Sequence, residues 1–407
     1  MARIGFMMPG YRSHAAVHGA LAEVLRSRGH DTVFVGPPAL APHARREGAS
    51  FAPFPGPAAA ARIESGLRGF VRLMWETAAA TAAHGAGGPA ALRRAGIDLV
   101  AVDEMEPGGS LAAEAAGVPR ITLAMSLPLR RDPGVPPPYV GWDWRPGPDG
   151  ERRARGAWRV SDALMTAQRR ALVQSCRDHG LPVRDRPSDW VAPGGSIAQL
   201  VGGLDFPRPQ PVGPLVGPIR RPAADDADVP FDGAPYVFAS LGTIAGERQR
   251  LFRIIAEAAS RTGMNLALAH CDGLSPAQVR ELQALAPGRI DIRGFFDQRP
   301  TIRAASAVIT HAGLNTVLDA AEAGVPMIAL PLGNDQNGMA ARLQRIGGAI
   351  ILSARRVTPA ALADALVAVT SEPGWRTALD PARAEIAAAG GAAAAADAIE
   401  AALRQTG

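Results

Sequence analysis

The segment from Thr310 to Arg342 constrains the fold more than any other part of the chain. It reads THAGLNTVLDAAEAGVPMIALPLGNDQNGMAAR and continues from the short apolar run AVIT. A turn that carries His311 and Gly313 leads into a helix expected to begin near Asn315, and the strand-like run MIALPL follows. A strand, a helix and a second strand in this order indicate a β-α-β unit, and therefore a parallel sheet.

The turn and the loop of this unit also predict a ligand. A helix N-terminus that begins in small residues offers free backbone N–H groups and a positive dipole end, which favour a phosphate. Asp335 and Gln336 follow the second strand. Parallel sheets bind ligands at their carboxyl edge, so this acid–amide pair is expected one strand away from the phosphate. The combination predicts a nucleotide sugar.

Composition excludes several enzyme classes. All 43 basic residues are arginine. P-loop enzymes, pyridoxal-phosphate enzymes and Schiff-base aldolases need a lysine, so they are excluded. The two cysteines, Cys176 and Cys271, form neither a disulfide framework nor a C-x-x-C site, which is typical of a reducing cytoplasm. Without a signal peptide or a run of about 18 apolar residues, we expect a cytoplasmic protein with no transmembrane segment, although transient membrane contact stays open.

The net charge of +5 does not predict nucleic-acid binding, because the arginines are scattered among 38 acids. The densest patch, Glu151–Arg159, is interpreted as a solvated helix face. His14 and His18 share helical spacing but have no further ligand nearby, so we predict no metal site. The run GAGGPA, 85–90, lacks a preceding strand and is predicted to be a loop rather than a dinucleotide fingerprint.

Strand-like and helical runs alternate in two series. Strands are expected in RIGFMM, DTVFVG, DLVAVD and RITLAM, and again in YVFASLG, MNLALAH, IDIRGF, AVITHAG, MIALPL and AIILS. A proline-rich stretch between the series cannot form a helix or a central strand and predicts a linker. We expect a first α/β domain at 1–205, the linker at 206–230, a second α/β domain at 231–380 and a C-terminal helix within 381–407. A further helix is expected over Ser161–His179.

Two polar residues follow strands of the first series. His14 comes after RIGFMM and Asp103 ends DLVAVD. An imidazole can take the proton of a hydroxyl, and a carboxylate on its far nitrogen fixes the tautomer. Glu104 and Glu106 compete for the role of that carboxylate. A histidine that only caps or packs is the alternative for His14.

Taken together, these motifs resemble the donor signature of family 1 glycosyltransferases. The motif HAGLNTVLDA is most similar to that of bacterial carotenoid (zeaxanthin) glucosyltransferases, and then to that of bacterial macrolide glycosyltransferases. Similar motifs upstream, RGFFDQ, SLGT and the N-terminal PGYRSHAAVHGALAEVLRSRGHDTVFV, extend the resemblance over nearly the whole chain. The residues that follow the donor signature are His311, Gly313, Asn315-Thr316, Gly324-Val325-Pro326, Pro331, Asp335-Gln336 and Ala340.

The resemblance implies the GT-B fold, in which two Rossmann-like, doubly wound α/β domains face each other across a cleft. It implies inverting transfer of a hexose from a UDP- or dTDP-sugar to a hydroxyl of a hydrophobic acceptor, such as a carotenoid, a macrolide or another polyketide. Such reactions belong to natural-product and antibiotic biosynthesis. His14 would be the general base and Asp103 its partner, with no metal and no cofactor besides the sugar donor. The C-terminal helix would cross back to the first domain.

On the donor side, the resemblance implies a diphosphate site, a sugar site and a base site. Phe replaces the usual Trp of the base site, and Asp297 replaces its Pro, which leaves UDP and dTDP both open. The implied donor residues are His311, Gly313, Asn315 and Thr316 with Ser240, Gly242 and Thr243 for the diphosphate, Asp335 and Gln336 for the sugar, Phe295 and Gln298 for the base, and Glu322, a loose match, for the ribose.

Three other functions stay open: a nucleotide-sugar epimerase of the same fold, a non-catalytic helper, and an NAD-dependent enzyme, which the missing fingerprint disfavours. The segment GLRGFVRLMWET, 66–77, and the segment with Trp142 and Trp144 either line a hydrophobic acceptor mouth or pack in the core. Sugar, acceptor and oligomeric state cannot be deduced from the sequence.

Overall fold

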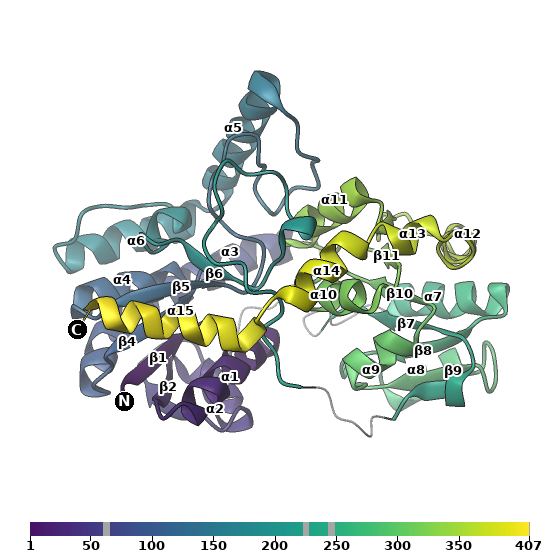
Figure 1. The fold of residues 1–407 in the computed structure, drawn as a ribbon, viewed down its shortest axis with the longest axis horizontal. Helices are drawn as coiled ribbons and strands as arrows, with labels where there is room; N and C mark the ends of the chain where they lie inside the picture. The colour runs from purple at the N-terminus through teal and green to yellow at the C-terminus, as the bar shows by residue number, and fades with distance from the viewer. Residues whose placement is uncertain (60–65, 223–227, 243–248, 407) are drawn as a thin grey trace.

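Two six-stranded sheets organise the chain in the computed structural model, which describes residues 1–59, 66–222, 228–242 and 249–406 (Figure 1). Every strand pair is parallel, and the first sheet has the order β3-β2-β1-β4-β5-β6. Its strands are β1 (Arg3–Met7), β2 (Asp31–Gly36), β3 (Ser50–Pro53), β4 (Leu99–Asp103), β5 (Arg120–Ala124) and β6 (Ser196–Ala198).

The second sheet repeats the same winding, with the order β12-β11-β10-β7-β8-β9. Its strands are β7 (Tyr236–Ser240), β8 (Asn265–Ala269), β9 (Ile290–Arg293), β10 (Ala307–Thr310), β11 (Met327–Ala329) and β12 (Ala349–Ile351). Two doubly wound α/β units are therefore confirmed. The sequence pattern missed β6, a strand of three residues.

Helices bury both faces of the first sheet. Ile4 and Phe6 of β1 pack in one cluster with α1 and α15, whereas Met7 belongs to a second cluster with α3 and α4. Successive side chains of a strand point to opposite faces, so strands covered on both sides read as continuous apolar runs. The helices of this unit are α1 (Arg12–Ser27), α2 (Ala41–Arg46), α3 (Gly66–Arg94), α4 (Pro107–Ala116), α5 (Gly147–Leu164) and α6 (Thr166–Asp178), with 3-10 turns η1 (Pro38–Leu40), η2 (Pro187–Trp190) and η3 (Gly202–Leu204).

The second sheet is covered in the same way, and one of its cores also joins the two units. Val237 packs with α7 and α12, while Phe238 packs in a cluster that includes Ala124 and Leu127 of the first unit. The remaining elements are η4 (Pro230–Gly233), α7 (Gln249–Thr262), α8 (Pro276–Gln283), α9 (Gln298–Ala304), α10 (Leu314–Ala323), α11 (Gln336–Ile346), α12 (Pro359–Ser371), α13 (Gly374–Thr377), α14 (Asp380–Ala388) and α15 (Gly391–Thr406).

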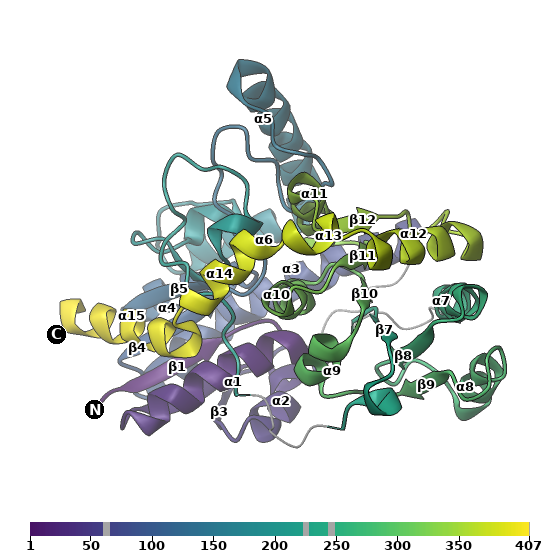
Figure 2. The same cartoon turned by 45° about the vertical axis from the view of Figure 1, so that its right-hand side comes forward.

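The chain crosses back to the first sheet at its C-terminal end, as Figure 1 and Figure 2 both show for α14 and α15. Ala395 and Ile399 of α15 are fully buried in the cluster that contains α1. The single alanine-rich helix expected here is broken into α14 and α15: Ala389 is extended, and Gly391, the first residue of α15, adopts a positive φ of 52°. Within the described ranges, no single helix is long and apolar enough to cross a membrane, whereas the bent pair Gly374–Ala388 and Gly391–Gln405 passes by length and composition.

Two local predictions were wrong. The helix expected over Ser161–His179 is two helices, α5 and α6, which meet at Met165. GAGGPA lies inside α3 rather than in a loop. Its glycines are packing positions, because a Cβ on Gly88 would approach the Cβ of Ala112 on α4 to 2.7 Å.

Candidate active site

The candidate site residues gather where the winding of each sheet reverses. In the first sheet β1 and β4 are neighbours, and the chain leaves them in opposite directions; β7 and β10 have the same relation in the second sheet. Such switch points open a crevice at the carboxyl edge, where α/β proteins bind ligands. His14 lies in the first turn of α1, directly after β1, and Asp103 ends β4.

His14 and Asp103 form a hydrogen-bonded pair. His14 Nδ1 lies 2.6 Å from Asp103 Oδ2, and the side chain of His14 is 15% exposed while that of Asp103 is fully buried. The backbone N–H of Met105 donates to the other oxygen of Asp103 at 2.9 Å. An ionised carboxylate only accepts hydrogen bonds, so Nδ1 of His14 carries the proton and Nε2 keeps a lone pair. This is the tautomer that a general base needs.

Electrostatics reinforce the pair. Burial of the ring works against protonation, yet Asp103 outweighs it and raises the pKa of His14 above 6.5. Burial likewise works against ionisation of Asp103, but His14 outweighs it and lowers the pKa of that carboxyl below 3.8. His18 behaves differently: its Nδ1 donates to the carbonyl oxygen of His14 at 2.9 Å, its ring is fully buried against Phe6, and burial lowers its pKa. His18 therefore packs behind the pair.

The two competing acids point elsewhere. Glu104 accepts a hydrogen bond from the backbone N–H of Leu129 at 2.8 Å and another from the hydroxyl of Ser196. Glu106 accepts from Thr81 Oγ1 at 3.1 Å and lies 3.5 Å from His84. Of the three neighbouring acids, Asp103 is the one that the structure brings to His14.

On the donor side, Ser240 and His311 end up side by side. Ser240 pairs in register with Thr310, the residue before His311, and Ser240 is 5% exposed. The ring of His311 fits between two glycines: a Cβ on Gly242 would lie 2.7 Å from it, and one on Gly313 would lie 2.5 Å from it. Glycine is thus required at both positions for the histidine to lie in this turn.

Helix α10 begins directly after this turn, with Gly313 as its N-cap and no capping side chain. Its first backbone N–H groups are therefore free of side-chain acceptors, as an anion site needs. The side chain of Asn315 is engaged differently from the expectation, because its Oδ1 accepts from Gln199 of the first unit at 2.8 Å. Thr316 is 6% exposed. Thr243 lies outside the described residues.

The residues expected at the base and ribose are engaged with other side chains. Phe295 is 39% exposed and carries the guanidinium of Arg12 on its ring, 4.0 Å from the centroid. Gln298 Nε2 donates to Asp319 Oδ2 at 2.7 Å, and Asp319 also pairs with Arg220 of the chain between the two sheets. Burial raises the pKa of Asp319.

Glu322, the loose match for the ribose, is held by two arginines. It pairs with Arg220 at 2.7 Å and with Arg299 at 3.4 Å. The acid next to Gln298 is Asp319, one helical turn earlier on α10. Helical i, i+3 spacing puts the two acids on neighbouring positions of one face, so the sequence alone could not choose between them.

Asp335 and Gln336 lie where α11 begins, facing the first unit. Burial raises the pKa of Asp335, against the opposing interaction with the backbone of Leu127 and the charge of His14. Asp335 thus lies close enough to His14 to feel its charge across the two units. Gln336 Oε1 accepts from the backbone N–H of Leu332 at 2.9 Å and of Gly333 at 3.2 Å, so it shapes the loop that presents Asp335.

A cavity of about 530 Å³ is lined by residues that neighbour His14 and Asp103 in the chain. Tyr11 lies on it, with its ring 5.8 Å from that of His14, and Met105 lies two residues beyond Asp103. Its other walls come from α3 and from the segments that follow β1, β2, β3 and β4: Pro9, Gly10, Pro37, Ala39, Pro57, Ala59, Arg72, Glu76, Thr77, Ala79, Ala80, His84 and Glu106. Three of these residues belong to the segment 66–77, for which the sequence left an acceptor mouth and core packing both open, whereas Trp142 and Trp144 lie elsewhere.

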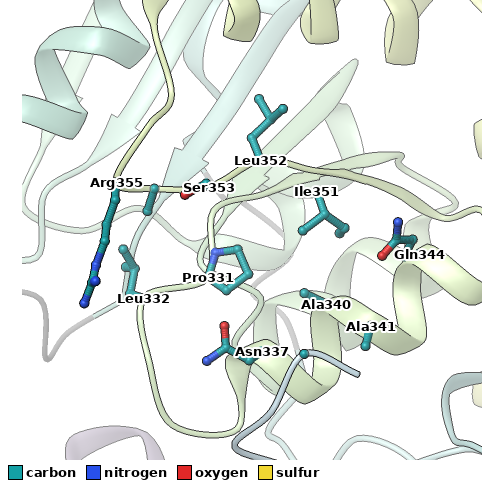
Figure 3. Close-up of a pocket in the computed structure, with 12 residues that line it drawn as sticks. Pro331, Leu332, Asn337, Ala340, Ala341, Gln344, Ile351, Leu352, Ser353 and Arg355 are labelled. Carbon is teal, nitrogen blue, oxygen red and sulfur yellow. The ribbon is translucent and has the colours of Figure 1, made fainter. Parts of the chain in front are cut away.

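A second cavity, of about 480 Å³, lies on the donor unit between α11 and the end of β12 (Figure 3). Ala340 and Gln344 of α11 line it, together with Ile351 of β12 and Arg355 of the following loop. Pro331 and Ala340 of the donor signature line it, whereas the described residues predicted to contact the sugar donor or to act in catalysis do not. In the described part of the chain, no group of three or more His, Cys, Asp and Glu side chains could hold a metal ion.

Sequence reasoning missed several residues that the structure brings to this site. Arg12 and Gln199 come from the first unit, Arg220 from the segment between the sheets, and Asp319 from α10. Of these four residues, only Asp319 had a signal in the sequence, because it lies one helical turn before Glu322. The others become visible only when the two units are assembled.

Comparison with known proteins gives both sequence and structural similarity over the whole chain. The family profile described as UDP-glucoronosyl and UDP-glucosyl transferase matches residues 236–379. A zeaxanthin glucosyltransferase of Pseudescherichia vulneris is 36% identical, covering 99% of this chain and 98% of its own. The crystal structure of the glycotransferase of kitacinnamycin has a TM-score of 0.74 at 22% identity, covering 98% of this chain and 99% of its own. The glycosyltransferase VinC, in complex with dTDP, has a TM-score of 0.72 at 19% identity, covering 99% of this chain and all of its own.

Proposed function

The chain belongs to the family 1 glycosyltransferases, and we propose that it transfers a hexose from a UDP- or dTDP-sugar to a hydroxyl of an apolar acceptor with inversion of the anomeric configuration. One observation carries the proposal: the hydrogen-bonded His14–Asp103 pair at the first switch point lies within reach of the charge of Asp335 at the edge of the second. A base for the acceptor thus stands opposite a carboxylate for the sugar. The epimerase alternative has no support among the relatives described above.

In this proposal, residues 1–205 bind the acceptor and residues 231–380 bind the donor. Nε2 of His14 takes the proton of the acceptor hydroxyl, and Asp103 holds the imidazolium that forms. The acceptor oxygen attacks the anomeric carbon from the face opposite the diphosphate, so the configuration inverts. Asp335 accepts a hydrogen bond from a sugar hydroxyl and orients the ring.

The leaving diphosphate is stabilised by the turn between β10 and α10. The free N–H groups and dipole of α10, the ring of His311 and the backbone at Ser240 and Gly242 all lie at that edge. Donors fixed in advance around a developing charge stabilise the transition state without reorganisation. Phe295 stacks on the base, and Gln298 with Asp319 reads the nucleoside.

The acceptor enters the cavity beside Tyr11. Its walls are mainly small apolar residues and proline, and its volume lies within the range of small-molecule sites, about 300–1,000 Å³. A carotenoid end ring or a polyketide aglycone matches this chemistry. The zeaxanthin relative acts on a carotenoid by its name, which favours an elongated apolar alcohol as acceptor.

The proposal is tested by turnover. Purified enzyme is given UDP-glucose or dTDP-glucose with zeaxanthin and with a macrolide aglycone, and products are weighed by mass spectrometry. His14→Ala is expected to lower kcat by about 10²- to 10⁴-fold, the usual contribution of a general base. His30→Ala serves as control, because His30 lies against Glu400 far from the site. Donor hydrolysis with no transfer to any hydroxyl acceptor would contradict the proposal.

A further inference from the structure

Arg12 joins the two units at the donor edge. It is the first residue of α1, two residues before His14, yet its guanidinium lies 4.0 Å from the ring centroid of Phe295, in the loop after β9. Phe295 is the aromatic residue expected to stack on the nucleobase. A side chain of the acceptor unit therefore reaches into the donor site.

The position of Arg12 is electrostatically unfavourable for the protein alone. Helix α1 has no acidic residue in its first turn, and a cation near a helix N-terminus opposes the helix dipole. Among the ion pairs formed within the described residues, none involves Arg12. A cation–π contact at a partly exposed ring offsets about 0.5–1 kcal/mol at most sites. Within the part of the chain that the structure describes, the guanidinium thus has no anionic partner.

The surroundings of Arg12 are those of the expected diphosphate. Burial raises the pKa of the Cys271 thiol, while a hydrogen bond with Ser240 and the charge of Arg12 oppose that rise. Arg12 is therefore within electrostatic reach of Cys271, which lies two residues after Ala269, the register partner of Ser240 at the end of β7. Ser240 is in register with Thr310, the residue before His311. The guanidinium and the free N-terminus of α10 face the same edge.

We propose that Arg12 is a donor-binding residue supplied by the acceptor unit, and that its guanidinium binds the diphosphate of the nucleotide sugar. When the base occupies Phe295, the guanidinium exchanges the ring for phosphate oxygens, which its planar fork matches better than an ammonium would. The inference rests on the proposed function. It makes closure of the two units depend on the diphosphate, because the cation belongs to one unit and the remaining phosphate donors to the other.

Calorimetric titration separates the diphosphate from the base. UDP and uridine, and dTDP and thymidine, are titrated into the wild type, Arg12→Met and Arg12→Lys. Arg12→Met, which keeps an apolar stem, is expected to weaken binding of the diphosphate about 10- to 100-fold, the effect of a charged hydrogen bond. Nucleoside binding should stay within about twofold, since the base keeps Phe295. Arg12→Lys should recover part of the diphosphate affinity.

Arg153→Met is the matched control, because Arg153 lies over Trp142 at 4.4 Å in the same kind of contact. It should change the binding of neither ligand. The inference is overturned if Arg12→Met weakens nucleoside and diphosphate equally, strengthens both, or changes neither, with thermal melts showing that each variant folds. A wild type that binds neither UDP nor dTDP would instead sink the donor assignment itself.

Discussion

The two switch points share one strand order but differ in how complete their chemistry is. At the first, His14 and Asp103 are already in hydrogen-bonding contact, with the tautomer fixed and Nε2 left available. At the second, the side chains expected to hold the donor are engaged with protein partners: Asn315 with Gln199, and Gln298 with Asp319. The base is built in advance, whereas donor groups must exchange partners.

This difference follows from what each group does. A general base acts on one proton and gains from a fixed orientation, so burial and a single carboxylate suffice. A nucleotide sugar is a large polar ligand, and its binding residues are polar groups that would be costly to leave unsatisfied without it. Partners such as Gln199 and Arg220 satisfy them in its absence. Removing a group at the first point should therefore cost catalysis, and at the second should change affinity.

Asp103→Asn is the largest expected effect. The amide can donate to Nδ1 of His14, which stabilises the wrong tautomer and removes the charge that supports the imidazolium. We expect kcat to fall about 10⁴-fold with little change in donor KM. Asp98→Asn is the control, since Asp98 accepts from the backbone N–H of Arg3 away from the site. A change confined to KM would show that the first switch point is a binding site, like the second.

The pH profile sharpens the same prediction. His14 must be neutral to act, so kcat/KM is expected to fall as pH drops through its pKa, which Asp103 holds above 6.5. In Asp103→Asn the charge of Asp103 is gone and burial becomes the dominant influence on His14 over the charge of Asp335, so the acid limb should move to lower pH. The same two pKa shifts also predict how the free energy of unfolding depends on pH. The contribution of His14 is complete below the unfolded pKa and is lost as pH rises through the raised folded pKa. The stabilising contribution of Asp103 is present above pH 3.8 and is lost as pH falls through its lowered folded pKa. Nuclear magnetic resonance of the His14 ring measures the shift directly.

Asp335→Asn is expected to have an intermediate effect on the donor side. The substitution keeps the shape but removes the charged acceptor for a sugar hydroxyl, a loss of about 10- to 100-fold in kcat/KM for the sugar nucleotide. Affinity for UDP or dTDP alone should be unchanged, because the free nucleotide has no hexose. Asp143→Asn, an exposed acid paired with Arg345, is the control. Weaker binding of free nucleotide would place Asp335 at the diphosphate instead.

The sequence predicted the elements whose evidence is local. Apolar runs marked β1, β4 and β10, which put His14 after the first of these strands, Asp103 at the end of the second and His311 directly after the third. It failed where packing decides. GAGGPA is helical because its glycines let α3 approach α4, which a turn-forming composition cannot reveal.

The sequence also could not predict that other protein groups hold the donor-binding side chains at the second switch point. Gln199, Arg12 and Arg220 are far from the donor motifs along the chain and reach them only in the assembled fold. No local pattern distinguishes such residues from ordinary surface polar groups, since their role depends on contacts of high sequence separation. The signature residues could be predicted, and the residues that hold them could not.

Gln199→Leu is the smallest expected effect and the most direct test of partner exchange. Gln199 Nε2 donates to the carbonyl oxygen of Met125 and to Asn315 Oδ1, each at 2.8 Å. Losing both should lower the free energy of unfolding by about 1–3 kcal/mol, since buried acceptors are left unsatisfied. Because Asn315 is freed for the diphosphate, donor KM should fall about 2- to 10-fold. Gln174→Leu, which removes an exposed bond to Asp178, is the control. A rise in donor KM would mean that Gln199 orients Asn315 for the ligand, and the donor edge would then be as preorganised as the catalytic pair.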